Sequence, residues 1–125
     1  MPILVADDDS VSRKTLQFQL EQWGHSVLTA VDGDDAWQLF QTHDCPIVIT
    51  DWIMPRMAGV NLIQKIRAAE QTTYTYVILL TSKSQKSDLV TGLASGADDF
   101  LVKPVDPSEL QARLQTGLRI SGLRQ

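Results

Sequence analysis

Residues 46–51, PIVITD, form a short apolar run that ends in an acidic residue, and this kind of run recurs along the chain. Polar residues also follow the runs PILVA (2–6), YVILL (76–80) and FLV (100–102). Runs nearly continuous in Val, Ile and Leu are typical of parallel strands covered on both faces. Because the carboxyl ends of parallel strands meet at one edge of a sheet, we expect the residues that follow these runs to gather there. These residues are Asp7, Asp8, Asp51, Thr81 and Lys103.

Strand-like runs alternate with segments of helical period over the whole chain. The expected strands are Ile3–Ala6, Ser26–Ala30, Ile47–Thr50, Val77–Leu80 and Phe100–Val102. Apolar residues at helical spacing follow each of them, beginning at Leu16, Ala36, Leu62, Leu89 and Leu110. This alternation predicts an α/β fold of the (βα)5 type, a doubly wound five-stranded parallel sheet.

Several helix ends are also marked in the sequence. The last helix is expected over about residues 106–120, because DPSE (106–109) supplies a capping carboxylate, a proline at the first helical position and a glutamate three residues after the cap. Asp9 is expected to cap the first helix, and Gly24 and Gly96 lie where helices should end. The apolar stripe of the last helix is expected to consist of Leu110, Leu114 and Leu118.

Composition fits one small globular domain over residues 1–125. The chain is 43% hydrophobic and 21% charged, and its net charge of -4 argues against direct nucleic-acid binding. It has no run of about 20 apolar residues, so we expect no membrane span. The single Cys45 suits a reducing cytoplasm, which is the expected location.

The residues at the expected sheet edge predict a magnesium-dependent phosphoryl site. Adjacent carboxylates at Asp7 and Asp8 repel each other, and a hard divalent cation with a preference for oxygen ligands offsets that repulsion. The Asp51 carboxylate is the candidate nucleophile, since aspartate can attack phosphorus to give an acyl phosphate. Thr81 and Lys103 supply a hydroxyl and an ammonium group of the kind that stabilises a transferring phosphoryl group.

Three motifs in this chain resemble the receiver domain of two-component response regulators. They are LVADD (4–8), ITDWIMPRMAGV (49–60) with its Met-Pro and Gly59, and Lys103-Pro104. The resemblance implies a flavodoxin-like receiver fold, phosphorylation of Asp51, and roles in phosphoryl transfer for Thr81 and Lys103. Ala58 departs from the family, which often has Asp there, and this affects a loop position only.

The resemblance also implies a metal ligand set and a switch. Mg2+, for which Mn2+ is a substitute, is expected on Asp8 and Asp51 directly, on Asp7 through water, and on the backbone carbonyl of Ile53. In the family, the peptide bond before the proline at position 104 is commonly cis. The expected switch residues are Thr81 and Phe100.

Implied partners are a sensor histidine kinase or a histidine phosphotransfer protein as phosphodonor. Phosphorylation is expected to bias a surface made of the fourth helix, the fifth strand and the fifth helix, used for a homodimer or for contact with an output domain outside this chain. The chain itself is expected to be a signalling domain that assists its own phosphorylation and dephosphorylation, and not a separate enzyme. The apolar Ile53 is expected to give a long phosphoryl lifetime. For Lys83 two effects stay open, since it can oppose a long lifetime by attracting water or shield the phosphate.

Two other classes are disfavoured by single features of the sequence. A phosphatase of the haloacid dehalogenase type needs a second acid two residues beyond its nucleophile, and Ile53 stands there. A flavodoxin-like cofactor binder needs a phosphate loop rich in Ser, Thr and Gly after the first strand, whereas DDDSVSR (7–13) would repel a phosphate.

Overall fold

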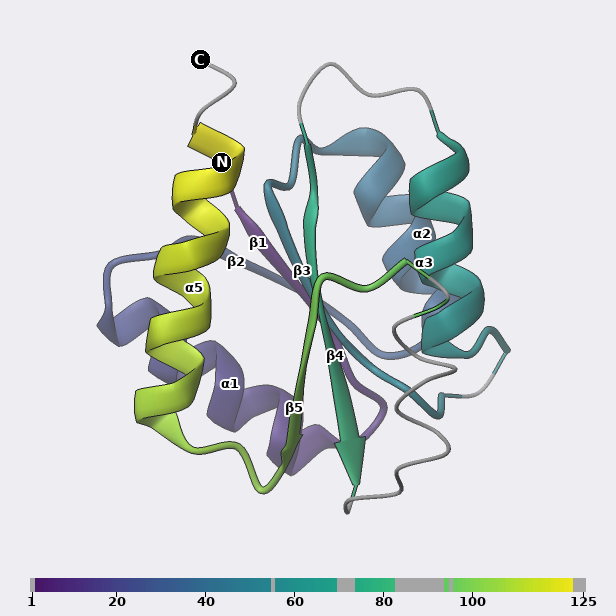
Figure 1. Cartoon of the computed structure of the whole chain (residues 1–125). Coiled ribbons are helices and arrows are strands. Elements are labelled where there is room, and N and C mark those ends of the chain that lie inside the picture. Colours follow the sequence, from purple (N-terminus) through teal and green to yellow (C-terminus); the bar gives the residue numbers. More distant parts are fainter. Residues whose placement is uncertain (1, 55, 70–73, 83–93, 95, 123–125) are drawn as a thin grey trace.

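The computed structural model describes residues 2–54, 56–69, 74–82, 94 and 96–122. Five strands form a single parallel sheet in the order β2-β1-β3-β4-β5 (Figure 1). The strands are β1 (Ile3–Ala6), β2 (Val27–Ala30), β3 (Ile47–Asp51), β4 (Tyr76–Ser82) and β5 (Asp99–Lys103). The predicted strands are confirmed, with ends that differ by at most two residues.

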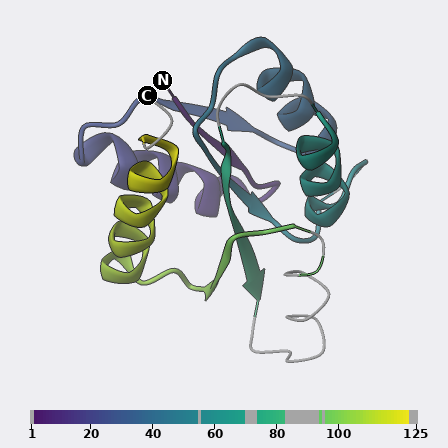
Figure 2. The ribbon, with the colours of Figure 1, turned by 45° about the horizontal axis from the view of Figure 1, so that its top comes forward.

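Helices cover both faces of this sheet, as the doubly wound prediction requires. The described helices are α1 (Ser10–Gln22), α2 (Gly33–Thr42), α3 (Gly59–Ala68) and α5 (Pro107–Gly122). Helices α1 and α5 lie on one face, and α2 and α3 lie on the other (Figures 1 and 2). The fourth predicted helix, around Leu89, lies outside the described residues. Within the described part, no helix is both long enough and apolar enough to span a membrane.

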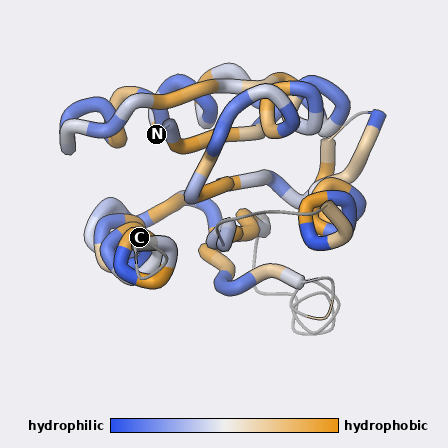
Figure 3. The backbone as a smooth tube through the Cα atoms, turned by 90° about the horizontal axis from the view of Figure 1, so that it is seen from above, coloured by the Kyte–Doolittle hydropathy of each residue, from blue (hydrophilic) through white to orange (hydrophobic). Residues whose placement is uncertain are grey.

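Successive side chains of each strand point to opposite faces of the sheet, and this divides the core into two apolar layers. Ile3 and Val5 of β1 are buried among residues of α1 and α5, whereas Leu4 and Ala6 face α2 and α3. Seen from above, each helix changes between hydrophobic and hydrophilic residues along its length (Figure 3). An amphipathic helix of this kind buries one stripe and leaves the opposite side in solvent.

The predicted stripe of α5 is wrong at its last position. Leu110 and Leu114 are buried, but Leu118 is 36% exposed. Gly117 lies against β4 instead, where an added Cβ would stand 2.8 Å from the Tyr76 ring. The small glycine therefore lets the helix approach the sheet closely, and this contact displaces the buried stripe by one position.

Capping residues lie where the sequence places them. The Asp9 carboxylate accepts a hydrogen bond from the Ser12 backbone N–H at 3.1 Å, and the Asp106 carboxylate accepts one from Ser108 N–H at 3.2 Å. Gly24 has a φ of 91° just after α1, a conformation that favours glycine. The cap at Asp9 fixes the start of α1 directly beside the acidic residues that end β1.

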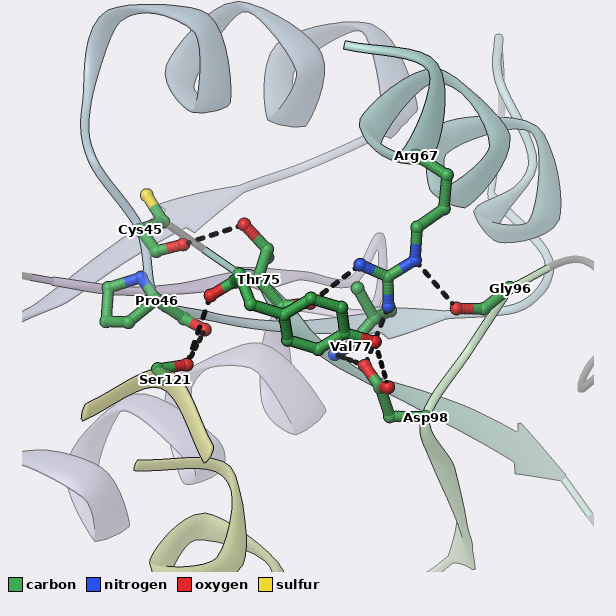
Figure 4. A network of polar contacts seen from close by, with 9 residues as sticks. Cys45, Pro46, Arg67, Thr75, Val77, Gly96, Asp98 and Ser121 are labelled. Atoms are coloured by element: carbon green, nitrogen blue, oxygen red, sulfur yellow. Dashed lines mark hydrogen bonds and ion pairs between the residues drawn. The ribbon is translucent and has the colours of Figure 1, made fainter. Parts of the chain in front are cut away.

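A polar network at the amino ends of β4 and β5 was not apparent in the sequence. The Arg67 guanidinium donates to the Gly96 carbonyl at 2.9 Å, to the Thr75 carbonyl at 2.7 Å and to the Asp98 carboxylate at 2.7 Å (Figure 4). Asp98 also accepts hydrogen bonds from the Tyr74 hydroxyl and from the Val77 N–H. The network thereby fastens the end of α3 to the two strands that carry Thr81 and Lys103.

Replacing Arg67 by methionine should lower the free energy of unfolding by about 2 kcal/mol, because the Asp98 carboxylate loses its ion pair and two carbonyls each lose the hydrogen bond from the guanidinium. Urea unfolding followed by circular dichroism measures this loss. Arg119→Met is the matched control, since Arg119 is exposed on α5, and it should change stability by less than about 0.5 kcal/mol. Equal effects of the two substitutions would contradict the structural role of the network.

Candidate functional site

Three carboxylates meet at the carboxyl edge of the sheet, at the lower end of β4 in Figure 1. Asp7 directly follows β1, and Asp51 is the last residue of β3. These two strands are neighbours with Ala6 beside Thr50, so the two aspartates lie next to each other. Carboxylate oxygens of Asp7, Asp8 and Asp51 all lie within 4.8 Å of one another. Hard divalent cations prefer this kind of donor set.

Lys103 lies between two of these carboxylates. It ends β5, and its Nζ is 2.9 Å from Asp7 Oδ2 and 3.1 Å from Asp51 Oδ2. Asp7 is fully buried, and the side chains of Lys103 and Asp51 are 21% and 15% exposed. Because these charges are largely removed from water, their interaction is stronger than that of a surface ion pair.

The surroundings shift the pKa of each of these groups. Burial raises the pKa of Asp7, but hydrogen bonds from Ser12, Asp9 and Lys103 outweigh it, and the pKa lies below its ordinary value. Burial also raises the pKa of Asp51; Lys103 lowers it and the charge of Asp7 raises it, so the pKa lies above its ordinary value. Burial lowers the pKa of Lys103, but the two carboxylates outweigh this and raise it. The charged form of Asp51 is thus the one that the site stabilises least.

The loop after Asp51 folds tightly back on the end of β3. Asp51 Oδ1 accepts a hydrogen bond from Trp52 N–H at 2.8 Å, and Gly59 N–H donates to the Trp52 carbonyl at 2.7 Å. A Cβ on Gly59 would stand 2.1 Å from the Asp51 carbonyl oxygen, so only glycine fits. Pro55 lies outside the described residues, and Arg56 adopts a φ of 71°. The motif glycine therefore has a steric reason, which is the close approach of α3 to the candidate nucleophile.

Thr81 and Phe100 share one face of the sheet. Thr81 is buried in β4 and lies beside Val102 of β5, while Phe100 lies beside Leu79 two positions earlier. Phe100 is partly buried against the apolar layer under α2 and α3. The structure thus brings Thr81 to the same edge of the sheet as Lys103. Phe100 lies on the same face as Thr81, but two positions farther from that edge.

Two further predicted positions flank the acidic group. Ile53 is 77% exposed, and because its hydrocarbon side chain has no ligand atom, a metal contact from this residue would have to come from its backbone carbonyl. The Lys103–Pro104 peptide bond is cis. Lys83, the other residue linked to phosphoryl lifetime, lies outside the described residues.

Two residues near the site were missed by the sequence analysis. Ser12 contributes to the low pKa of Asp7, and Arg13 Nη1 donates to the Asp7 backbone carbonyl at 2.8 Å. Both come from the start of α1, which returns past the end of β1. The cap predicted at Asp9 was a signal that α1 begins here, but it did not show which side chains would turn toward the site.

Comparison with known proteins agrees with this arrangement. Residues 3–115 match the family described as response regulator receiver domain. The chain is 41% identical over 117 residues to a protein named probable transcriptional regulator ycf27 from Cyanidium caldarium, covering 94% of this chain and 46% of that protein. It is 36% identical over 117 residues to a chemotaxis protein CheY homolog from Campylobacter jejuni, covering 92% of this chain and 90% of that protein.

A solved structure supports the same family. The receiver domain of the Francisella response regulator 1452 superposes with a TM-score of 0.86 at 32% identity, covering 94% of this chain and 96% of that one. The chain belongs to the response regulator receiver domain family and is a phosphoacceptor domain of two-component signalling. It spans about half the length of the ycf27 relatives that it matches.

Proposed function

We propose that Asp51 accepts a phosphoryl group from a phosphohistidine in a magnesium-dependent reaction. The observation that carries this proposal is the group of three carboxylates within 4.8 Å, with the Lys103 ammonium between two of them. An Asp51 carboxylate oxygen attacks phosphorus, the phosphorus–nitrogen bond of the donor breaks, and the imidazole leaves with its electron pair and takes up a proton. The product is an acyl phosphate on Asp51.

The donor set fits Mg2+. Asp7, Asp8, Asp51 and the Ile53 carbonyl would hold it, and Mn2+ prefers similar oxygen ligands. Three carboxylates carry three negative charges, and Lys103 together with a divalent cation carries three positive charges. When bound, the ion neutralises a site that would otherwise repel the phosphoryl group.

The remaining site residues are assigned by their positions. Lys103 is proposed to donate to a phosphoryl oxygen on Asp51, and the 3.1 Å between its Nζ and Asp51 Oδ2 supports this role. Thr81, at the same sheet edge, is proposed to donate its hydroxyl to another phosphoryl oxygen. Movement of Thr81 toward the phosphate would free space on its sheet face, and Phe100 is proposed to respond by turning inward.

The proposed phosphodonor is a sensor histidine kinase or a histidine phosphotransfer protein in the cytoplasm. The proposed output surface comprises the fourth helix, β5 and α5, used in a homodimer or for contact with an output domain. The ycf27 relatives are more than twice as long as the matched region, which favours an output domain, whereas the CheY homolog has nearly the length of this chain. In either case, this chain is proposed to be a signalling domain that assists its own phosphorylation and dephosphorylation.

Incubation with acetyl phosphate tests the proposal without a cognate kinase. We expect intact-protein mass spectrometry to show one added phosphoryl group per chain in the presence of Mg2+, and little addition when EDTA removes the metal. Addition of equal extent in EDTA would contradict the metal dependence. Absence of any addition at saturating Mg2+ would contradict the phosphoacceptor assignment.

Replacing Ile53 by asparagine should accelerate loss of the phosphoryl group by roughly tenfold, because the amide can orient the attacking water and the apolar side chain cannot. The wild-type acyl phosphate should last minutes or longer. Phosphate release after removal of acetyl phosphate measures both rates. Ile53→Leu is the control and should behave as the wild type. Loss within seconds in the wild type would refute this role of Ile53.

A further inference from the structure

Arg13, near the start of α1, lies against the turn that carries the acidic residues. Its Nη1 donates to the backbone carbonyl oxygen of Asp7 at 2.8 Å. This carbonyl belongs to the peptide bond that joins Asp7 to Asp8. The guanidinium therefore fixes the plane of the peptide between two of the proposed metal ligands.

The Asp7 carbonyl needs such a donor. Asp7 is fully buried and lies just beyond the end of β1, although its N–H still donates to the Ala30 carbonyl at 3.1 Å. Among the described residues, the Arg13 guanidinium is the donor for the carbonyl on the other side of Asp7. A buried carbonyl without a partner is costly, so loss of this donor favours rotation of the peptide.

The orientation of the Asp8 side chain depends on this peptide more than the orientation of the Asp7 side chain does. The Asp7 carboxylate is held by Asp9 N–H at 3.0 Å and by Lys103 Nζ at 2.9 Å. Asp8 is exposed, and among the described residues none donates a hydrogen bond to its carboxylate. The backbone therefore sets the direction of the Asp8 Cα–Cβ bond, and with it the region that the carboxylate can reach.

We infer that Arg13 is a positioning residue for the metal site, acting through the Asp7 carbonyl on the direction of Asp8. The inference rests on the proposed magnesium-dependent function. Groups that orient the ligands of a metal commonly change its affinity by tenfold or more, although they do not touch the metal.

The sign of the effect separates this role from electrostatics. Arg13 carries a positive charge close to a site that attracts a cation, so removal of the charge alone should tighten Mg2+ binding. Loss of the hydrogen bond to the Asp7 carbonyl should weaken it. Lys14 offers a matched control, because it is an exposed basic residue next to Arg13 on the same helix.

The experiment is a Mg2+ titration followed by tryptophan fluorescence, on variants shown by circular dichroism to be folded at the temperature used. Arg13→Ala should raise the dissociation constant for Mg2+ by about tenfold, and Arg13→Lys should recover part of the affinity because it retains a donor. Lys14→Ala should bind Mg2+ as tightly as the wild type or slightly more tightly. In acetyl phosphate labelling, Arg13→Ala should need more Mg2+ for half-maximal rate but should approach the wild-type rate at saturation.

Two different failures are distinguishable. If the wild type binds Mg2+ and Arg13→Ala binds it equally or more tightly, in step with Lys14→Ala, the positioning role is wrong and the proposed function stands. If Arg13→Ala has a lower labelling rate even at saturating Mg2+, with an unchanged dissociation constant, the role is also wrong. If the wild type does not bind Mg2+ at millimolar concentration, the proposed function fails and the inference fails with it.

Discussion

Replacing Asp51 by asparagine should abolish labelling by acetyl phosphate. An amide oxygen is a poor nucleophile toward phosphorus, and the acyl phosphate can form only on a carboxylate. The fold should survive, since the asparagine carbonyl can still accept the hydrogen bond from Trp52 N–H and Lys103 keeps its contact with Asp7. Burial raises the pKa of Asp51, so its charged form is disfavoured and the neutral amide should not destabilise the protein.

Asp34→Asn is a suitable control for this result. Asp34 lies near the start of α2, and its side chain is 51% exposed. The substitution removes the same charge from a residue outside the group formed by Asp7, Asp8 and Asp51, so labelling should continue at the wild-type rate. Unchanged labelling of the Asp51→Asn protein would show that another residue accepts the phosphoryl group.

Replacing Asp8 by alanine should weaken Mg2+ binding by an order of magnitude or more, because it removes a carboxylate proposed to contact the metal directly. The fold should be as stable as the wild type or more stable, since repulsion within the carboxylate group falls. Fluorescence is a suitable measurement because Trp52 adjoins Asp51 in the chain. The free energy of unfolding in EDTA should be recorded beside the affinity.

Asp9→Ala should have the opposite effects, a loss of stability with little change in Mg2+ affinity. Asp9 caps α1 through its hydrogen bond from Ser12 N–H, so its loss should cost about 1 kcal/mol of stability. Its backbone N–H, which holds the Asp7 carboxylate, is retained. Mg2+ affinity should therefore change little. If Asp8→Ala and Asp9→Ala lowered the affinity equally, the metal would be held by overall charge and not by a specific ligand.

The sheet was predictable because each strand is a short apolar run that can be recognised from neighbouring residues alone. A strand such as Ile47–Thr50 is covered on both faces, so it reads as an unbroken apolar run that needs no distant residue for its recognition. The same regularity places Asp7, Asp51 and Lys103 at strand ends, and parallel pairing then brings them to one edge. The contacts that Lys103 makes with Asp7 and Asp51 are thus ones that the sequence pattern implied.

Other contacts depend on packing that the sequence does not express. Arg67 and Asp98 are 31 residues apart, and their ion pair follows from the way α3 lies beside the entry to β5. Leu118 matched the helical period, but the close approach at Gly117 turned it toward solvent. Arg13 reaches the Asp7 carbonyl only because the capped start of α1 returns past β1. Each of these contacts depends on how closely two helices or strands approach each other, and not on the residue pattern within a single helix or strand.

Mapping the phosphorylated residue tests the central claim most directly. Borohydride reduces an aspartyl phosphate to homoserine, so reduction after acetyl phosphate treatment marks the acceptor permanently for peptide mass spectrometry. We predict homoserine at position 51 of the wild-type protein, dependent on Mg2+, and none at that position in Asp51→Asn. Homoserine at position 7 or 8, or a stable phosphate on a hydroxyl group with no homoserine at all, would contradict the account.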